Sequence, residues 1–258
     1  MTFAGRASER YGGFGKRLNR RLADLGLAEL SAYQAFLISH PAEWARLEAM
    51  CRIPISRFYR DRSVCDVVSR RLLPEAASRA VARGDNAVTC WSAGCASGEE
   101  PYTLAMAWRF GVAPGWPAVD FTVIASDAEA TMTERAKAAC YNSSSLKELP
   151  QEWRERAFIR RDAVFCLVPE LQQDVRFLNQ DIRRSMPDGP FDLILCRNVV
   201  FTYFDETLQR RLTNELRERL VPGGYLVLGG HEALPAGAGG FALLAPHLPI
   251  YRREPLSA

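Results

Sequence analysis

The alternation of short apolar runs with helical patterns, from residue 86 onward, is the feature of this sequence that most constrains its fold. Five apolar runs are typical of buried strands: AVTCWSA (87–93), FTVIASD (121–127), VRFL (175–178), FDLILC (191–196) and YLVLGG (225–230). Three helical patterns separate them: PYTLAMAWRF (101–110), TMTERAKAACY (131–141) and ETLQRRLTNELRERL (206–220). This alternation predicts an α/β fold with a doubly wound, mostly parallel sheet.

The rest of the chain follows other patterns. Residues 1–80 read as short helices and predict a small N-terminal α-helical domain with its linker, before an α/β domain over residues 81–258. The last of these helices, SVCDVVSRRLL (63–73), is expected to stop before Pro74. The segment 160–178 breaks the alternation and predicts a small inserted antiparallel β-subdomain. The tail 241–253 predicts an antiparallel edge of the main sheet.

Composition narrows the class of protein. The chain has 258 residues, of which 48% are hydrophobic and 24% charged, values typical of a globular protein. It has no 18-residue apolar run and no apolar leader after its first residues, so we expect a cytoplasmic protein without membrane insertion. Seven cysteines without a CxxC pair predict reduced thiols rather than disulfides, and no metal site is expected.

The net charge of +3 is unevenly distributed. Residues 1–80 carry 14 Lys and Arg against 8 Asp and Glu, and the basic pattern KRLNRRLADLGL (16–27) lies in this part. A solvated helical face and a surface that meets an acidic partner both explain this excess. No nucleic-acid partner is expected.

The stretch CWSAGCASGEEPYTLAM (90–106) occupies the first strand-to-helix turn, where open parallel sheets bind nucleotide-like ligands. Gly94 and Gly98 allow close approach to the backbone, but the pattern matches neither a dinucleotide fingerprint nor a P-loop. Glu99 and Glu100 at the helix start would repel a pyrophosphate and attract a cation. S-adenosylmethionine, which is cationic at its sulfonium and ammonium and has no phosphate, fits these residues.

Acidic residues end the next two strands. Asp127 is expected to accept from ribose hydroxyls, as the acid after the second strand does in dinucleotide-binding folds. Asp181 stands where it would accept from the adenine amino group. Although either residue alone is also a common helix cap, the two together with the glycine loop strengthen the prediction of this cofactor.

Four stretches resemble the chemotaxis receptor glutamate methyltransferases, the CheR-type family that uses S-adenosylmethionine. They are SRFYRD (56–61), WSAGCASGEEPYTLAM (91–106), ASDAEATMTERAKAACY (125–141) and FDLILCRNVVFTYFD (191–205). The resemblance runs from about residue 14 over nearly the whole chain. It implies a helical N-terminal domain, a class I (Rossmann-like) methyltransferase domain and a small β-subdomain.

The resemblance also implies the site residues. Arg60 and Tyr203 would be catalytic: Arg60 would hold the acceptor or cofactor carboxylate, and Tyr203 would orient the acceptor oxygen. The residues expected to line the cofactor site are Ser56, Arg60, Gly94, Glu99, Glu100, Asp127, Asp181, Ile182, Arg197 and Asn198. The sequence departs from the family pattern at Pro54 and Ser56, where Asn and Thr are usual, and in one extra residue between Asn198 and Tyr203.

The expected reaction is O-methylation of glutamate side chains in chemoreceptors or a similar acidic helical protein. A glutamate acceptor with a pKa of about 4.3 is already ionised, so no general base is needed. Consistently, His231–Pro235 fails the HExxH pattern and no histidine belongs to a nucleophile motif. Two alternatives stay open, a methyltransferase acting on a small-molecule carboxylate and a non-catalytic module that senses the cofactor. A dinucleotide oxidoreductase conflicts with the paired glutamates.

Overall fold

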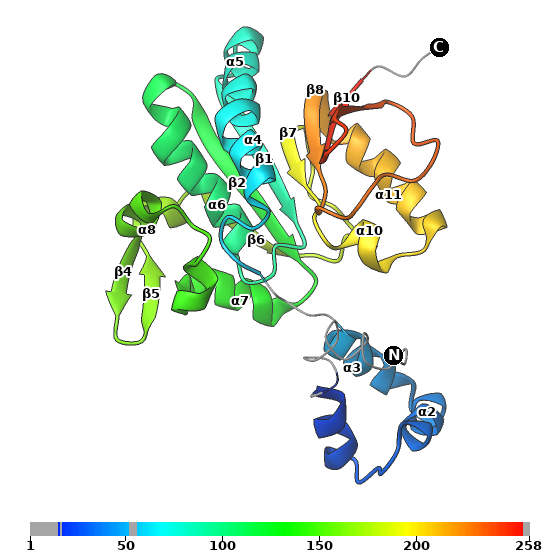
Figure 1. Cartoon of the computed structure of the whole chain (residues 1–258). Helices are drawn as coiled ribbons and strands as arrows, with labels where there is room; N and C mark the ends of the chain where they lie inside the picture. The colour runs from blue at the N-terminus through cyan, green and yellow to red at the C-terminus, as the bar shows by residue number, and fades with distance from the viewer. Residues whose placement is uncertain (1–14, 16, 52–55, 255–258) are drawn as a thin grey trace. The chain divides into compact units, whose positions relative to one another are not determined.

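The computed structural model describes residues 15, 17–51 and 56–254, and the chain divides into two compact units, Met1–Ile55 and Ser56–Ala258 (Figure 1). The sequence-based boundary stood at residue 80. The segment of residues 62–80, placed there in the N-terminal part, belongs to the second unit, where it forms one helical segment with residues 81–83.

The first unit is helical. Residues 17–24 form a helix, followed by α2 (Leu30–Ser39) and α3 (Pro41–Cys51). Gly26 ends the first helix with a φ of +67°, a left-handed conformation that glycine adopts without strain. Leu18, Leu22, Tyr33 and Leu37 form its buried core.

The second unit is built on a mixed sheet. Within residues 56–254 this sheet has seven strands in the order β6-β2-β1-β7-β8-β10-β9. The first five strands in this order are parallel to one another, whereas β10 pairs antiparallel with both β8 and β9. The strands are β1 (Ala87–Ala93), β2 (Asp120–Asp127), β6 (Val175–Asn179), β7 (Phe191–Leu195), β8 (Leu220–Val227), β9 (Phe241–Ala245) and β10 (Leu248–Arg253). The predicted doubly wound sheet and its antiparallel edge are confirmed.

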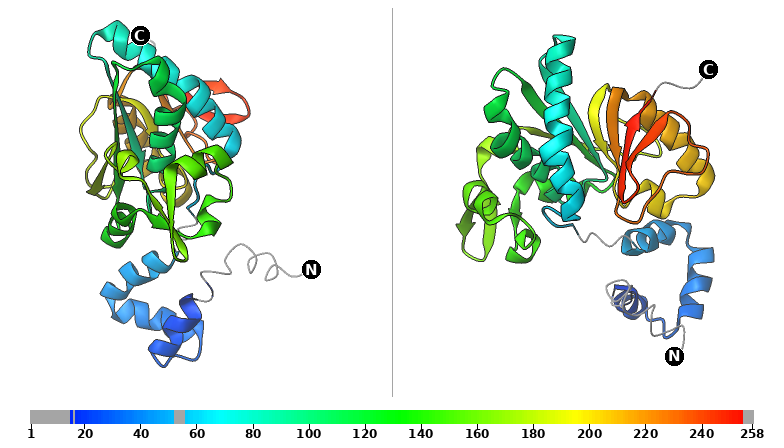
Figure 2. Two further views of the ribbon diagram at one scale, coloured as in Figure 1. Left: turned by 90° about the vertical axis from the view of Figure 1, so that its left-hand side faces the viewer. Right: turned by 45° about the horizontal axis from the view of Figure 1, so that its top comes forward.

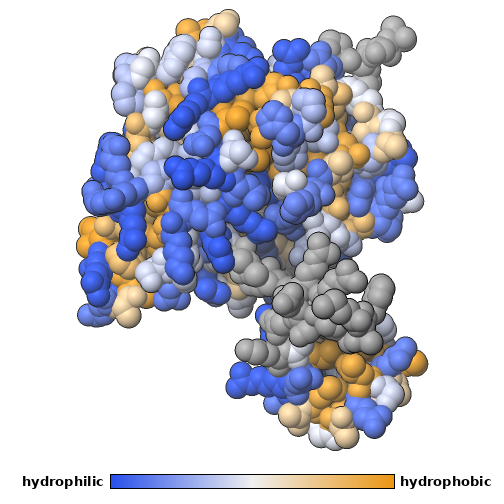
Figure 3. Space-filling model, in the orientation of Figure 1, coloured by the Kyte–Doolittle hydropathy of each residue, from blue (hydrophilic) through white to orange (hydrophobic). Residues whose placement is uncertain are grey.

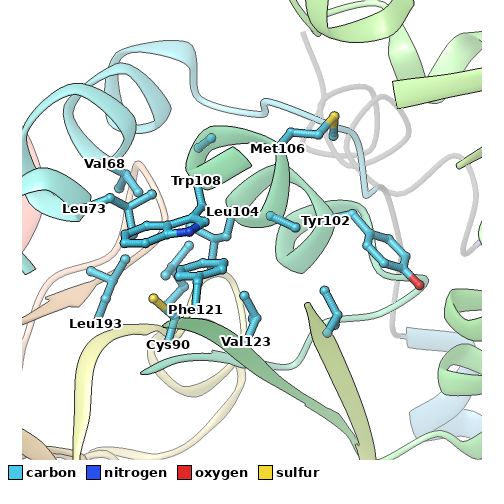
Figure 4. Close-up of a cluster of buried hydrophobic side chains, with 14 of the residues drawn as sticks. Val68, Leu73, Cys90, Tyr102, Leu104, Met106, Trp108, Phe121, Val123 and Leu193 are labelled. Atoms are coloured by element: carbon cyan, nitrogen blue, oxygen red, sulfur yellow. The ribbon is translucent and has the colours of Figure 1, made fainter. Parts of the chain in front are cut away.

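Helices cover both faces of this sheet (Figure 2). Strand β1 shows the reason: Cys90 packs into the core on one face, whereas the next residue, Trp91, packs into the core on the other. In the first core, the rings of Trp108 and Phe121 stack at 4.6 Å (Figure 4). The helices of this unit are α4 (Arg62–Val67), α5 (Leu73–Arg83), α6 (Glu99–Ala107), α7 (Ala130–Ala138), α8 (Gln151–Ala157), α9 (Pro169–Gln172), α10 (Val200–Tyr203) and α11 (Glu206–Glu218).

The helix of residues 62–83 continues through Pro74, although the sequence pattern predicted that it stops before this proline. A π-helical turn, Val68–Leu72, joins α4 to α5, and the Leu73 N–H donates to the Val68 carbonyl. The wider turn accommodates the proline ring, which would clash with the carbonyl four residues earlier in a regular α-helix.

A separate three-stranded antiparallel sheet, in the order β3-β5-β4, forms the expected β-subdomain. Its strands are β3 (Cys140–Tyr141), β4 (Phe158–Arg161) and β5 (Val164–Leu167). It therefore begins earlier in the chain than the expected 160–178, and β6 belongs to the main sheet.

One prediction about the cysteines is wrong, because Cys140 and Cys166 form a disulfide. The two residues lie directly opposite each other on the antiparallel strands β3 and β5. Their separation of 26 residues follows no motif, so only the strand pairing brings them together.

The face of the second unit visible in Figure 3 carries mostly hydrophilic side chains, with smaller apolar areas between them. Within the described residues, none of the helices has the length and apolar character needed to cross a bilayer.

Candidate functional site

The predicted site residues gather where the parallel strands of the second unit end. In such a sheet, the carboxyl ends of all parallel strands face one edge, and the loops that follow them form a common crevice. The loop 94–98 follows β1, Asp127 ends β2, residues 180–182 follow β6, and Arg197 and Asn198 follow β7. Arg60 joins them from the segment before α4.

The glycines of the loop make room for the protein itself. A Cβ at Gly94 would lie 2.3 Å from Cγ2 of Val199, which follows β7. A Cβ at Gly98 would lie 2.9 Å from that of Ala136 and 3.1 Å from the Tyr141 hydroxyl oxygen. Both glycines also have a positive φ, +76° and +91°. The loop therefore needs glycine to pack against its neighbours, in addition to the approach of a ligand.

The two glutamates at the start of α6 have different surroundings. Glu99 is buried, and its carboxylate accepts from the hydroxyl of Ser97 in the loop at 2.9 and 3.1 Å. Glu100 accepts from the Ser92 hydroxyl at 2.7 Å and from Arg197 at 3.1 Å. Glu99 thus stabilises the loop, and Glu100 belongs to a wider charged network.

Arg197 is the centre of that network. Its guanidinium contacts Asp61 at 2.5 Å, Glu100 at 3.1 Å and the Arg60 carbonyl at 3.2 Å. Its side chain is 7% exposed, and burial by itself lowers the pKa of an arginine, but Glu100 and Asp61 outweigh this and raise the pKa of Arg197. This arginine therefore stays charged and fixes the segment of Arg60 against β7.

Arg60 lies between two residues with left-handed backbone conformations, Tyr59 at a φ of +58° and Asp61 at +59°. Such conformations cost energy for residues other than glycine and cluster at functional sites. Contacts on both sides maintain them: the Tyr59 N–H donates to the Thr103 hydroxyl at 3.2 Å, and Asp61 pairs with Arg197. Arg60, Glu100 and Arg197 line a pocket together with apolar side chains that include Val64, Val68 and Leu104.

The acids that end the next strands are also held in place. Asp127 accepts from the backbone N–H groups of Ala96 and Glu129, each at 2.9 Å, so it ties the glycine loop to the end of β2. Asp181 forms a two-point ion pair with Arg183, at 2.7 and 3.0 Å. A carboxylate offers about four acceptor positions, so Asp127 keeps capacity for a ligand, whereas Asp181 already accepts four bonds from Arg183.

The remaining expected residues differ in exposure. Ile182 is buried in the core on the α11 side of the sheet, and Ser56 is half-buried at the start of the second unit. Asn198 has a φ of +56° and directly follows Arg197. Tyr203, at the end of α10, has 53% of its surface exposed. Pro54, the other departure from the family pattern, lies outside the described residues.

Sequence reasoning missed three residues that hold the site together. Asp61 was not among the expected site residues, yet it pairs with Arg197, 136 residues away. Ser92 was considered only as part of a strand, and Glu232 only as part of a failed HExxH pattern. The available signals were a polar residue at the end of a buried strand and an acid two residues after the glycines that follow β8.

Cys95 in the glycine loop is 2% exposed, and burial raises the pKa of its thiol well above the usual value. A protonated buried thiol is a poor nucleophile. Cys95 therefore serves as a small packing residue in this tight turn.

The donor and acceptor groups at this edge of the sheet suit S-adenosylmethionine. Carboxylates predominate, and the buried Oε1 of Gln180, next to Asp181 in the chain, has no hydrogen-bond partner among the described residues. A ligand rich in donors, with an ammonium, two ribose hydroxyls and an adenine amino group, would match these acceptors.

Comparison with known proteins agrees with this geometry. Residues 55–245 match the model of the CheR methyltransferase SAM-binding domain. A chemotaxis protein methyltransferase of Escherichia coli K12 is 33% identical over 84% of this chain and 74% of its own length. One of Listeria monocytogenes is 31% identical over 72% of this chain and 68% of its own.

A third relative, described as an uncharacterized 104.1 kDa protein of Rhodobacter capsulatus, is 31% identical over 92% of this chain. The chain spans only 25% of that protein's length. With the matched domain and the strand-end site together, this chain belongs to the CheR methyltransferase family and contains its S-adenosylmethionine-binding domain.

Proposed function

We propose that this chain is an S-adenosylmethionine-dependent methyltransferase that acts in the cytoplasm and methylates glutamate side chains of chemoreceptors. The observation that carries the proposal is the charged network at the carboxyl ends of the parallel strands, in which Arg197 contacts Glu100 and Asp61 and holds the segment that carries Arg60. Relatives named chemotaxis protein methyltransferases support the acceptor class.

The cofactor would be held by residues of complementary chemistry. Glu100 would accept from its ammonium and Asp127 from its ribose hydroxyls, and Ile182 would contact the adenine ring. Asp181 would accept from the adenine amino group in place of one of its bonds from Arg183. The residues that would shape the rest of the site are Ser56, Gly94, Glu99, Arg197 and Asn198. The bound cofactor would supply a methyl group on a positively charged sulfur.

Catalysis by this chain would rest on position and charge. A carboxylate acceptor needs no deprotonation at neutral pH, since glutamate has a pKa of about 4.3. Arg60 would hold a carboxylate by charge-assisted hydrogen bonds, and Tyr203 would orient the attacking oxygen.

The decisive experiment measures transfer of a labelled methyl group from S-adenosylmethionine to chemoreceptor-containing membranes. Methyl esters release methanol on treatment with base, so base-labile label is the expected result. Label that appears only with small carboxylic acids would instead support the small-molecule alternative. Tight binding of S-adenosylhomocysteine without any transfer would support the cofactor-sensing alternative.

The basic N-terminal helix is the proposed contact for an acidic receptor. Arg21 in this helix forms a two-point ion pair with Glu43 at 2.7 and 2.8 Å, and Arg17 donates to the Met50 carbonyl, so both stabilise the first unit. Arg20 is exposed. Arg20→Glu should therefore lower receptor methylation without changing cofactor affinity.

Arg70→Glu is the matched control, since the Arg70 side chain is 82% exposed on the second unit. Equal methylation rates for the two charge-reversal variants would show that the basic helix is a solvated face that does not contact the receptor.

A further inference from the structure

Glu232 lies in the loop after β8 and is 9% exposed. One carboxylate oxygen, Oε2, accepts from the backbone N–H groups of Asn198 and Gly229, each at 2.7 Å. The other, Oε1, accepts from the Thr202 hydroxyl at 2.5 Å. A single side chain thus joins the ends of β7 and β8 to the short helix α10.

The groups that Glu232 holds are next to Arg197 and Tyr203, two of the expected site residues. Asn198 has a φ of +56°, a left-handed conformation that asparagine adopts more readily than most residues and that the bond from its N–H helps to maintain. Thr202 precedes Tyr203 in α10. Oε2 therefore fixes the backbone of Asn198, an expected cofactor-site residue, and Oε1 fixes the helix α10 that carries Tyr203.

The close packing around this carboxylate shows that the site is built for it. A Cβ at Gly229 would lie 2.6 Å from Nδ2 of Asn198 and 2.8 Å from Oε2 of Glu232. Only glycine leaves room for both. The backbone after β8 is thus shaped to place an acid against the Asn198 loop.

We propose that Glu232 is a positioning residue for methyl transfer, which holds Asn198 through Oε2 and Tyr203 through Thr202 and Oε1. The proposal rests on the methyltransferase function proposed above. It assigns a separate role to each oxygen: Oε2 would affect cofactor affinity and Oε1 would affect kcat. If Glu232 only stabilised the core, removal of either contact would not change one of these quantities without the other.

Three variants test the two roles. Thr202→Val removes only the bond to Oε1, so kcat should fall about tenfold while the dissociation constant of S-adenosylhomocysteine changes less than about twofold. Glu232→Ala leaves two buried N–H groups without an acceptor. It should lower kcat and also lower the affinity for S-adenosylhomocysteine by about tenfold. Glu232→Gln retains an acceptor oxygen for these N–H groups and should restore most of the affinity.

Thr213→Val is the control for the loss of a threonine hydroxyl, at a residue that is buried whereas Thr202 is exposed. Thr213 is 2% exposed and donates only within α11, to the Gln209 carbonyl at 2.7 Å. This variant tests the loss of a buried hydroxyl away from the site. It should leave kcat and cofactor affinity unchanged, whatever its effect on the unfolding midpoint.

A double-mutant cycle separates positioning from general stability. In a Tyr203→Phe background, Thr202→Val should lower kcat much less than in the wild type, because the hydroxyl that it positions is already absent. Equal effects in both backgrounds, or an unchanged kcat for Thr202→Val, would overturn the assignment to Tyr203. Affinity retained in Glu232→Ala would overturn the assignment to Asn198.

Amide hydrogen exchange gives a readout that needs no substrate. Glu232→Ala should speed exchange over residues 198–204 relative to both the wild type and Thr213→Val. If the wild type transfers no methyl group to receptors, the proposed function fails, and exchange together with cofactor affinity still decides the role of Glu232. Unchanged exchange over this segment would refute that role.

Discussion

Gly94 and Val199 lie so close together that a Cβ on residue 94 would be 2.3 Å from Cγ2 of Val199. The glycine loop after β1 and the segment after β7 therefore pack against each other at the centre of the site. Gly94 also has a φ of +76°. Both the contact with Val199 and the left-handed backbone therefore disfavour any side chain at position 94.

Gly94→Ala should lower the free energy of unfolding by about 2–4 kcal/mol, from left-handed strain and overpacking together. Cofactor affinity should fall with it, because the loop must move. Calorimetry with S-adenosylhomocysteine and chemical denaturation measure the two effects.

Gly223→Ala separates these two causes, since Gly223 has a nearly equal φ of +74° and no atom within 4 Å of its Cβ position. The loss of unfolding free energy in Gly223→Ala should therefore reflect left-handed strain alone. A loss no larger in Gly94→Ala than in Gly223→Ala would show that contact with Val199 does not constrain the loop.

Arg197→Met should destabilise the second unit by about 3–5 kcal/mol, because Asp61 and Glu100 lose their buried partner. Cofactor affinity should fall as well, since the Arg60 segment is no longer held. Arg109→Met is the control: Arg109 pairs with the buried Asp174 at 2.6 Å, away from the site residues in the chain. It should lower stability and leave affinity unchanged; an equal affinity loss in both would contradict a local role for Arg197.

Cys95 should make the protein less stable at alkaline pH. Burial raises the pKa of this thiol above the usual 9.0, so the folded state retains a proton that the unfolded state releases. This contribution is fully present below pH 9.0 and is lost as the pH rises further. Cys95→Ala should therefore lose less stability than the wild type between neutral pH and the alkaline range, as measured by urea denaturation. Parallel curves would refute the assignment.

Reduction of the disulfide between Cys140 and Cys166 should lower the thermal unfolding midpoint. Closing a loop of 26 residues contributes on the order of 3 kcal/mol through restriction of the unfolded chain. Dithiothreitol should lower the midpoint of the wild type but not that of the variant with both Cys140→Ser and Cys166→Ser. A midpoint that responds equally in both proteins would place the effect at other cysteines.

The sequence by itself predicted the architecture, because strand and helix periodicities are local. The run 87–93 coincides with β1, and Leu212 and Leu216 of the predicted amphipathic helix are buried in α11. The edge of the sheet at which the site forms followed from the same pattern, since parallel strands all end on one side. Pro74 was misread because a π-helical turn is not visible in a local pattern.

Only the tertiary structure determined which residues hold the site residues in place. Asp61 meets Arg197 across 136 residues, and Glu232 meets the Asn198 backbone across 34. The Cys140–Cys166 disulfide likewise depends on the pairing of β3 with β5. Periodicity and motifs report the chemistry of neighbouring residues in the chain, whereas these contacts arise where separate strands end side by side. The sequence therefore determined the sheet and its binding edge, and the packing of distant loops decided how that edge is organised.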